Sequence, residues 1–413
     1  MRPCNEMQYH IGMTLRLRPD EHQQHIIAVN DGVRRFVYNK LVTLNREKYL
    51  LSKVTVYCKP VADRLSYVND VLSSKTVFKQ TAPWLASKEV DSCAFDNAFR
   101  AYRAAWNNFR RNPSFGVPVF KKKSYSQSYQ TNAHYPKGAN DLSDGNVRLI
   151  DRKHIQLPVL GSVRFQCSNK MRSILEDHTS GTRIGSIKVY RDNCGDYYCS
   201  LQLHSDVPFF DAMPKTGAVA AIDLNLTNLY SDSDGNVVDN PCFAAKAKSD
   251  VAKAQKKLSR RKCRAEAEGR SVYRSSNYQK QRLKTARLER KVARSREDYL
   301  NVQAKHLVEN QDLIVSEDLK VTNLLGNHCL AFAIADVSWG RFMQLIAIKA
   351  EMYGKVYVKV PPQYTTQTCS ACGHVMTGDE HIPLGVGEWE CPVCGTMHSR
   401  DVNAAINILA KVI

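Results

Sequence analysis

Four cysteines near the C-terminus have the spacing of a metal site. Cys369 and Cys372 form one CxxC pair and Cys391 and Cys394 form a second, with eighteen residues between the pairs. Two such pairs, each followed by a glycine that permits a tight turn, are typical of a zinc ribbon. Because four thiolates complete a tetrahedron, we predict one structural Zn²⁺ rather than a catalytic ion. A redox pair or a chance spacing is the alternative.

Three carboxylates are candidates for catalysis. Asp223 ends the apolar run AVAAID, Glu317 ends LIVSE, and Asp401 stands at the start of the last helical pattern. Each alone could be a solvated strand end or a helix-start residue that complements the helix dipole. The order of two strand-end acids and one helix acid across an α/β region is what a two-metal nuclease requires, since its carboxylates converge on two Mg²⁺ ions about 3.5–4 Å apart.

Other candidates are weaker. Asp318 and Asp336 compete with Glu317, which the preceding apolar run favours. The sequence contains no GxxxxGK[ST] and no glycine-rich dinucleotide loop, so it predicts neither an ATP site nor a dinucleotide site. Three histidines flank the cysteines and could each replace one as ligand, but we predict surface or phosphate contacts for them: His374, His381 and His398.

Positive charge is concentrated in one segment. The chain has 59 Lys+Arg and 40 Asp+Glu, a net charge of +19, and residues 253–296 hold 17 Lys+Arg against three Glu. The pattern of this segment predicts two helices on either side of a break at 269–277. It could be only a solvated hairpin, but its self-repulsion favours contact with nucleic acid. The residues predicted to make that contact are Lys256, Lys257, Arg260, Arg261, Lys262, Arg282, Lys284 and Arg287.

Two groups of elements must position these residues. Residues 9–18 alternate like a strand, a long helical pattern follows from Asp20, and residues 91–112 form a second helix whose aromatic stripe we interpret as core rather than a base-stacking platform. Alternating runs then predict a small β-barrel, interrupted by the helices and ending near residue 215. Beyond it, strands and helices alternate: a hairpin, the basic helices, the LIVSE strand, a helix at 338–353, another strand and the last helix.

The sequence contains no segment that resembles a signal peptide and no apolar run near the roughly 20 residues that span a bilayer. The other nine cysteines show no metal spacing, so we expect them to be reduced thiols in an intracellular protein.

Several segments resemble successive signatures of the TnpB (OrfB) family, transposon-encoded relatives of miniature type V CRISPR effectors. They are FVYNKLVTLNREKY, KAQKKLSRRK, VSEDLKVTNLL, YTTQTCSACGHV and EWECPVCGTMHSRDVNAAINIL. The resemblance implies an α+β multidomain fold, with an N-terminal OB-like β-barrel (WED) that carries a helical recognition insertion, then an RNase H-like RuvC domain with an inserted Cys4 zinc ribbon. The expected parts are residues 1–18, the first barrel strand; 19–120, the insertion; 121–215, the rest of the barrel; 216–368, the nuclease domain with basic helices at 247–310; 369–396, the ribbon; and 397–413, the final helix.

The resemblance also implies a function. It indicates an RNA-guided DNA endonuclease that binds an RNA from the transposon end, recognises a short motif beside a double-stranded DNA target and cuts by two-metal hydrolysis. Asp223, Glu317 and Asp401 match the family's three acids and would hold two catalytic Mg²⁺ ions. We expect a monomer, cytoplasmic and nucleoid-associated in a prokaryote. Alternatives are a miniature CRISPR effector with a CRISPR RNA and a guided DNA-binding regulator that cleaves little.

Two positions depart from the family's pattern. Asn225 stands where the family commonly has glycine, and Ser399 stands where it commonly has an acid. Neither removes a catalytic carboxylate, but Asn225 could alter the hairpin near the metals. Ser399 is also a predicted cap of the last helix.

Overall fold

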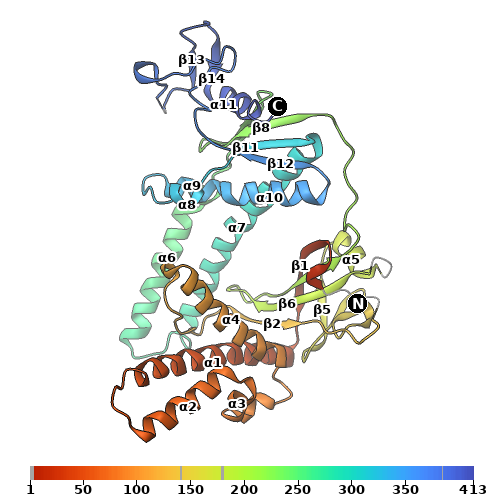
Figure 1. Cartoon of the computed structure of the whole chain (residues 1–413), viewed down its shortest axis with the longest axis vertical. Coiled ribbons are helices and arrows are strands. Elements are labelled where there is room, and N and C mark those ends of the chain that lie inside the picture. The colour runs from red at the N-terminus through yellow and green to blue at the C-terminus, as the bar shows by residue number, and fades with distance from the viewer. Residues whose placement is uncertain (1–3, 140–141, 178–180, 384) are drawn as a thin grey trace. The chain divides into compact units, whose positions relative to one another are not determined.

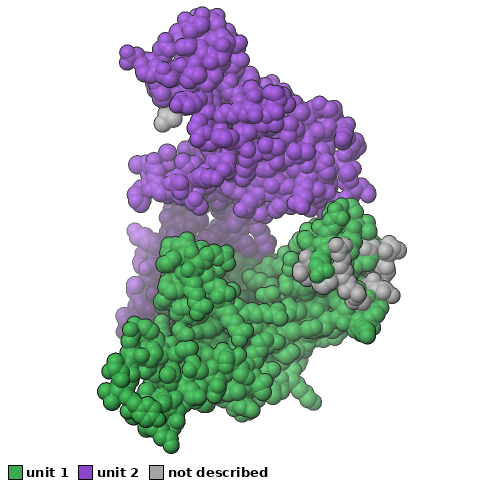
Figure 2. All heavy atoms as spheres, in the orientation of Figure 1, with its two compact units in different colours: residues 1–209 green, residues 210–413 purple. Residues whose placement is uncertain are grey.

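The computed structural model describes residues 4–139, 142–177, 181–383 and 385–413. The chain divides into two compact units, residues 1–209 and 210–413, which Figure 2 shows in separate colours. Each unit has its own sheet and its own hydrophobic core.

A seven-stranded antiparallel sheet forms the first unit's core, in the order β2-β6-β7-β1-β5-β4-β3. Its strands are β1 (Tyr9–Arg18), β2 (Gln127–Asn132), β3 (Arg148–Asp151), β4 (His154–Leu157), β5 (Gly161–Gln166), β6 (Arg183–Arg191) and β7 (Tyr197–Ser205). Alternate residues of β1, Met13, Leu15 and Leu17, are buried, as expected for a strand with one face on the core. A short helix, α5 (Asn169–Glu176), connects β5 to β6.

The helices of the first unit lie between β1 and β2 in the chain. They are α1 (Glu21–Leu51), α2 (Lys59–Ser73), α3 (Lys75–Gln80) and α4 (Ser92–Arg111). Asp20 begins α1 with a capping box: its carboxylate accepts the Gln23 N–H at 2.8 Å, and the Gln23 side chain accepts the Asp20 N–H at 3.1 Å. Along α4, Phe95, Phe99 and Tyr102 are buried, so the inner part of the aromatic stripe is core, as predicted.

A five-stranded mixed sheet organises the second unit, in the order β10-β9-β8-β11-β12. Its strands are β8 (Val219–Asp223), β9 (Asn228–Asp232), β10 (Val237–Asp239), β11 (Leu313–Glu317) and β12 (Val356–Val360). Strands β8, β11 and β12 run parallel to one another. Helices α7 (Ser276–Asn310) and α10 (Trp339–Met352) lie on one side, and α11 (Arg400–Leu409) lies on the other (Figure 1).

The alternation of side chains explains this layering. Ile222 and Ile314 share a buried cluster with Phe342 of α10. Their chain neighbours Ala221 and Val315 point to the opposite face, where they pack against Ile408 of α11. Because β8 and β11 are covered on both faces, they read as nearly continuous apolar runs.

The basic segment forms a helical hairpin. Helix α6 (Phe243–Ala267) and α7 are separated by residues 268–275, which overlap the expected break at 269–277. The helices approach closely at the small residue Ala254, whose carbonyl accepts from Gln281 Nε2 at 3.1 Å. Both oxygens of Asp336 accept backbone N–H groups of the first turn of α6, at 2.9 Å each. Asp336, a competing candidate for the site, therefore caps α6.

The remaining helices are α8 (Val321–Leu324) and α9 (Ala331–Val337). Residues 331–352, which form α9 and α10, are apolar and long enough to cross a membrane by length and composition. Two facts mark them as core helices: the left-handed residue Ser338 divides them, and Ile334, Phe342 and Ile346 are buried against the sheet and α7. Two short strands, β13 (Glu388–Glu390) and β14 (Met397–Ser399), pair in the cysteine-rich part.

Candidate active site and metal centre

The three predicted acids come together at one edge of the second sheet. In the parallel register of β8 and β11, Ser316 lies opposite Ile222, so Asp223 and Glu317 follow as neighbours on the same face. Adjacent strands are about 4.8 Å apart, which brings the two carboxylates close. Helix α11 packs on that face and presents Asp401 in its first turn.

The electrostatics of the cluster are those of crowded, desolvated carboxylates. Burial raises the pKa of Asp223 to about 8, with further contributions from Glu317 and Asp401. Burial also raises the pKa of Glu317, against the opposing effect of a hydrogen bond donated by Thr365 Oγ1 at 2.5 Å. A divalent cation would offset this repulsion, and carboxylate oxygens are the ligands that Mg²⁺ prefers, so the donor set fits that ion.

Asn225, the first departure from the family pattern, contacts the cluster directly. Its Nδ2 donates to Asp401 Oδ2 at 2.9 Å. The expected competitor of Glu317, Asp318, points away from the cluster: its side chain is 43% exposed and pairs with Lys320 at 2.5 Å. The structure thus separates the two adjacent acids at the end of β11, because consecutive residues of a strand face opposite sides.

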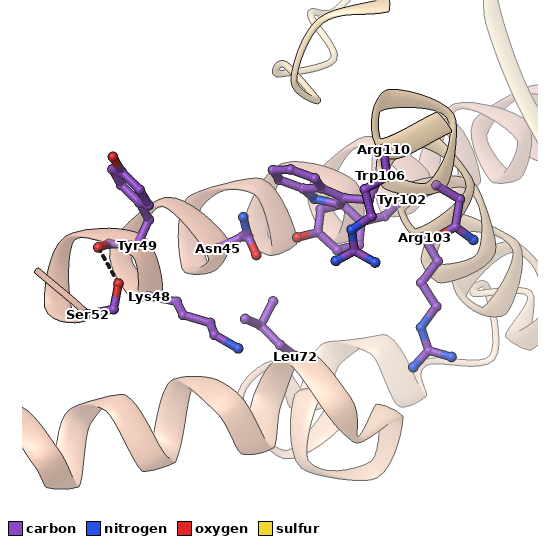
Figure 3. A pocket seen from close by; sticks show the side chains of 10 residues that line it. Asn45, Lys48, Tyr49, Ser52, Leu72, Tyr102, Arg103, Trp106 and Arg110 are labelled. Carbon is purple, nitrogen blue, oxygen red and sulfur yellow. Dashed lines mark hydrogen bonds between the residues drawn. The ribbon is translucent and has the colours of Figure 1, made fainter. Parts of the chain in front are cut away.

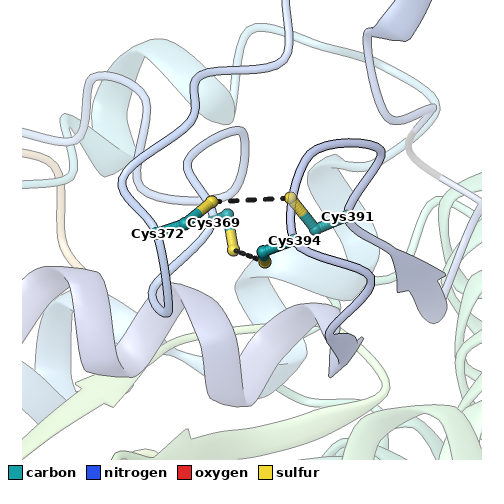
Figure 4. Close-up of side chains that lie close together, drawn as sticks. All are labelled: Cys369, Cys372, Cys391 and Cys394. Carbon is teal, nitrogen blue, oxygen red and sulfur yellow. Dashed lines mark hydrogen bonds between the residues drawn. The ribbon is translucent and has the colours of Figure 1, made fainter.

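The four cysteines converge as their spacing predicts. Their Sγ atoms all lie within 4.8 Å of one another, with Cys372 and Cys391 at 3.7 Å and Cys369 and Cys394 at 3.7 Å (Figure 4). The glycine after each pair adopts positive φ, as such turns require. Four convergent thiols fit one tetrahedral Zn²⁺ with no open position.

One histidine belongs to this cluster, contrary to the predicted surface role. His398 Nε2 lies 3.1 Å from Cys369 Sγ, the distance of a hydrogen bond to the sulfur rather than of a coordinated pair. His374 pairs with Glu380 at 2.8 Å, and His381 is exposed. His398 lies 29 residues from Cys369, so the tertiary structure and not the local sequence brings it to the thiol.

Helix α11 joins the cysteine-rich part to the acids. Asn403 Oδ1 accepts the Ser370 N–H at 2.9 Å, and Asn407 Nδ2 donates to the Thr368 carbonyl at 2.6 Å. The two asparagines are four residues apart and therefore on one face of the helix. Ser399 occupies the N-cap position of α11, but its side chain makes no capping hydrogen bond, so that prediction was wrong.

The predicted nucleic-acid contacts divide into two groups. Arg261 and Arg282 are half-buried. Arg261 of α6 donates to the Asn277 carbonyl of α7 at 2.6 Å and so links the two helices, whereas Arg282 donates to the Gln279 side chain within α7 at 3.1 Å. The remaining six are exposed: Lys256, Lys257, Arg260, Lys262, Lys284 and Arg287.

Sequence reasoning identified the acids and the cysteines but not the residues that orient them. Asn225 was noted only as a departure from a pattern, and nothing in the local sequence marks Thr365, which lies 48 residues from Glu317. Asn403 and Asn407 were visible only as polar positions of an apolar helix.

The fold has a counterpart among solved structures. The Cas12f1-sgRNA-target DNA complex contains a chain that superposes with a TM-score of 0.52 at 14% identity, covering 97% of this chain and 98% of that one. This likeness shows that the chain shares its overall fold with the protein chain of that complex.

Sequence comparison gives the family. Three family models match: "Helix-turn-helix domain" of OrfB_IS605 at residues 7–52, "Probable transposase" of OrfB_IS605 at 200–328, and "Cas12f1-like, TNB domain" at 339–408. The structure shows a strand and one continuous helix over residues 9–51, in place of two helices joined by a turn.

Two relatives extend over nearly the whole chain. A protein of Streptomyces pristinaespiralis named "Putative RNA-guided DNA endonuclease" is 30% identical over 96% of this chain and 87% of its own length. InsQ of Escherichia coli K12, with the same description, is 27% identical over 96% and 90%. The chain belongs to the TnpB (OrfB) family.

Proposed function

We propose that this protein is an RNA-guided DNA endonuclease that cuts with Asp223, Glu317 and Asp401 in a RuvC-type site. The observation that carries the proposal is the convergence of these acids from two parallel strand ends and a helix start. The mixed sheet with helices on both faces supports an RNase H-like assignment of residues 216–413. The full-length relatives named as RNA-guided DNA endonucleases support the reaction.

The chain's own residues prepare the site for phosphodiester hydrolysis. Asp223 is 7% exposed, and both of the other acids raise its pKa, so we assign it as the shared ligand of two ions. Thr365 fixes one oxygen of Glu317. Bound Mg²⁺ would activate the attacking water and offset the charge of the phosphate and the leaving oxygen. The Zn²⁺ cluster would hold the segment before α11 in place, because α11 carries both Asp401 and the asparagines that bind residues 365–370.

Nucleic-acid binding is assigned to other surfaces. The six exposed cations of the α6–α7 hairpin would contact the phosphates of a guide RNA or of its heteroduplex with DNA. We assign the first unit the role of an OB-like (WED) sheet with a helical recognition insertion that reads a short motif beside the target. The guide is proposed to derive from the transposon end, with a CRISPR RNA as the alternative that RNA sequencing decides.

The test begins with the RNA that copurifies with the full-length protein. That RNA is sequenced, and the complex is assayed with Mg²⁺ against a plasmid library that carries the matching target beside random flanks. We expect cleavage to be lost in Asp223→Ala while RNA binding remains. The matched control is Asp318→Ala, which removes an exposed acid at the end of the same sheet. Undiminished DNA cleavage by Asp223→Ala would refute the assignment of Asp223 to the catalytic site.

A further inference from the structure

Asn225 is held in a single orientation beside the acids. Its Oδ1 accepts the backbone N–H of Asn228 at 2.6 Å, while its Nδ2 donates to Asp401 Oδ2 at 2.9 Å. Only an oxygen can accept the first bond, so that bond fixes which end of the carboxamide faces Asp401. Trp339 Nε1 donates to the Asn225 carbonyl at 3.3 Å and anchors the same loop.

We propose that Asn225 is a positioning residue that preorganises Asp401 for metal binding. With Oδ2 of Asp401 held by the amide, Oδ1 remains for the ion and the carboxylate loses little rotational freedom when it binds. Glycine, which the family commonly has here, can make no such bond. In this chain a side-chain amide orients the third acid, and outer contacts of this kind typically change metal affinity by about 10- to 100-fold. The inference rests on the proposed site.

The discriminating variant is Asn225→Ser. A serine hydroxyl can still accept the Asn228 N–H, so the turn keeps its hydrogen bond, but it is too short to reach Asp401. A purely structural role of Asn225 therefore predicts a serine variant close to wild type. Positioning of Asp401 predicts weakened metal binding with stability retained. Asn225→Gly, which resembles the family, removes both bonds and should weaken binding as well.

Metal binding is measured on the full-length protein from the electron paramagnetic resonance of free Mn²⁺, alongside DNA cleavage at graded Mg²⁺. We expect about a tenfold higher dissociation constant for Mn²⁺ in Asn225→Ser and a similar rise in half-saturating Mg²⁺, with the melting temperature within about 2 °C of wild type. An unchanged dissociation constant would overturn the positioning role. If Asp223→Ala also left Mn²⁺ binding and cutting unchanged, the proposed site itself would fail, so the two failures are distinguishable.

A separate observation concerns a cavity of about 580 Å³ in the helical part of the first unit. It lies between α1, α2 and α4, and Figure 3 shows the side chains that line it. Three lining residues, Lys48, Arg103 and Arg110, are cationic and none is acidic. Aromatic rings of Tyr49 and Trp106 and side chains of Asn45 and Asn107 complete the wall.

The charge of this cavity is uncompensated, unlike that of its surroundings. On these helices and the neighbouring α3, Arg64 pairs with Glu47 at 2.6 Å and Lys75 with Asp96 at 2.8 Å. Within the described ranges, by contrast, no carboxylate pairs with the three cavity cations, and the contact of Arg103 is the Ser73 carbonyl at 3.4 Å. Three unpaired cations beside a half-buried indole fit a ligand that joins an anion to a flat ring.

We infer that this cavity binds one unpaired nucleotide of a single-stranded nucleic acid. The cations would contact the phosphates, Trp106 or Tyr49 would stack on the base, and the asparagine amides would contact its edge. This inference does not depend on the nuclease site.

Site-directed photocrosslinking tests it on the full-length protein. An RNA octamer with one 4-thiouridine, and a DNA octamer with one 5-iododeoxyuridine, are irradiated with the protein, and the crosslinked peptides are mapped by mass spectrometry. We expect crosslinks at Tyr49 or Trp106 that fall at least fivefold in the Lys48→Gln, Arg103→Gln, Arg110→Gln variant. The control, Arg64→Gln with Lys75→Gln, changes paired cations on neighbouring helices. Excess AMP should reduce the crosslinks only if the cavity also binds a free nucleotide. The proposed site would be refuted if no crosslinks formed at Tyr49 or Trp106, or if the triple variant and the control variant gave equal crosslinks.

Discussion

Replacing Asp223 with asparagine should stabilise the metal-free protein while abolishing cleavage. Burial and two neighbouring carboxylates raise the pKa of Asp223 from its usual 3.8 to about 8. Each pKa unit is worth about 1.4 kcal/mol, so ionising this group in the folded state opposes folding by up to about 6 kcal/mol. Polar groups and water around the site rearrange when Asp223 ionises, which offsets part of this cost. We therefore expect Asp223→Asn to raise the free energy of unfolding by about 2 kcal/mol at pH 8.

The sign of the pH dependence follows from the direction of the pKa change. The folded state binds the Asp223 proton more tightly than the unfolded state, so its contribution to stability is complete below about pH 4 and is lost as the pH rises to about 8. In EDTA, the melting temperature of wild type should therefore fall across this window more steeply than that of Asp223→Asn. At about 2–4 °C per kcal/mol for a domain of roughly 200 residues, the variant should melt about 4–8 °C higher at pH 8.

Differential scanning calorimetry in EDTA and then in Mg²⁺ measures both effects. Mg²⁺ should raise the melting temperature of wild type and have little effect on Asp223→Asn, because the shared ligand is gone. Asp318→Asn, at an exposed acid whose pKa is lowered by Lys320, serves as the control and should show neither effect. A variant that melts below wild type in EDTA at pH 8 would refute the argument that the acids repel one another.

Three further predictions concern other parts of the chain. Cys391→Ser should release one Zn²⁺ per chain by elemental analysis and lower the melting temperature, whereas Cys263→Ser, at an exposed thiol, should do neither. Lys355→Met should lower the free energy of unfolding in urea, because the Lys355 side chain is 1% exposed and its ammonium group pairs with Asp312 and donates to the Pro214 carbonyl. Lys305→Met, in a pair whose two side chains are exposed, should have a much smaller effect, and equal effects of the two variants would contradict the burial argument. Changing Lys256, Lys257 and Arg260 to glutamine should weaken binding of the copurified RNA and reduce the slope of log affinity against log salt by about 2, while the melting temperature stays the same. An unchanged slope would show that the hairpin does not contact the RNA.

The sequence by itself determined the chemistry of the two clusters. Thiol spacing is a local property, so Cys369, Cys372, Cys391 and Cys394 could be assigned before any fold was known, and their convergence is confirmed. Apolar runs ending in acids likewise placed Asp223 and Glu317 at strand ends and Asp401 in a first helical turn. The alternation of strands and helices predicted the α/β character of the second unit, because periodicity reflects which faces are buried.

Only the tertiary structure decided which side chains serve these clusters. Asn225 reaches Asp401 across 176 residues and Thr365 reaches Glu317 across 48, contacts that depend on strand register and helix packing rather than on neighbouring sequence. The same holds for Asp336, an acid that could have been catalytic but caps α6. A sequence specifies the groups that can react, whereas the pairing of distant elements determines which donors hold them, because a hydrogen bond requires about 3 Å between atoms that no local pattern brings together.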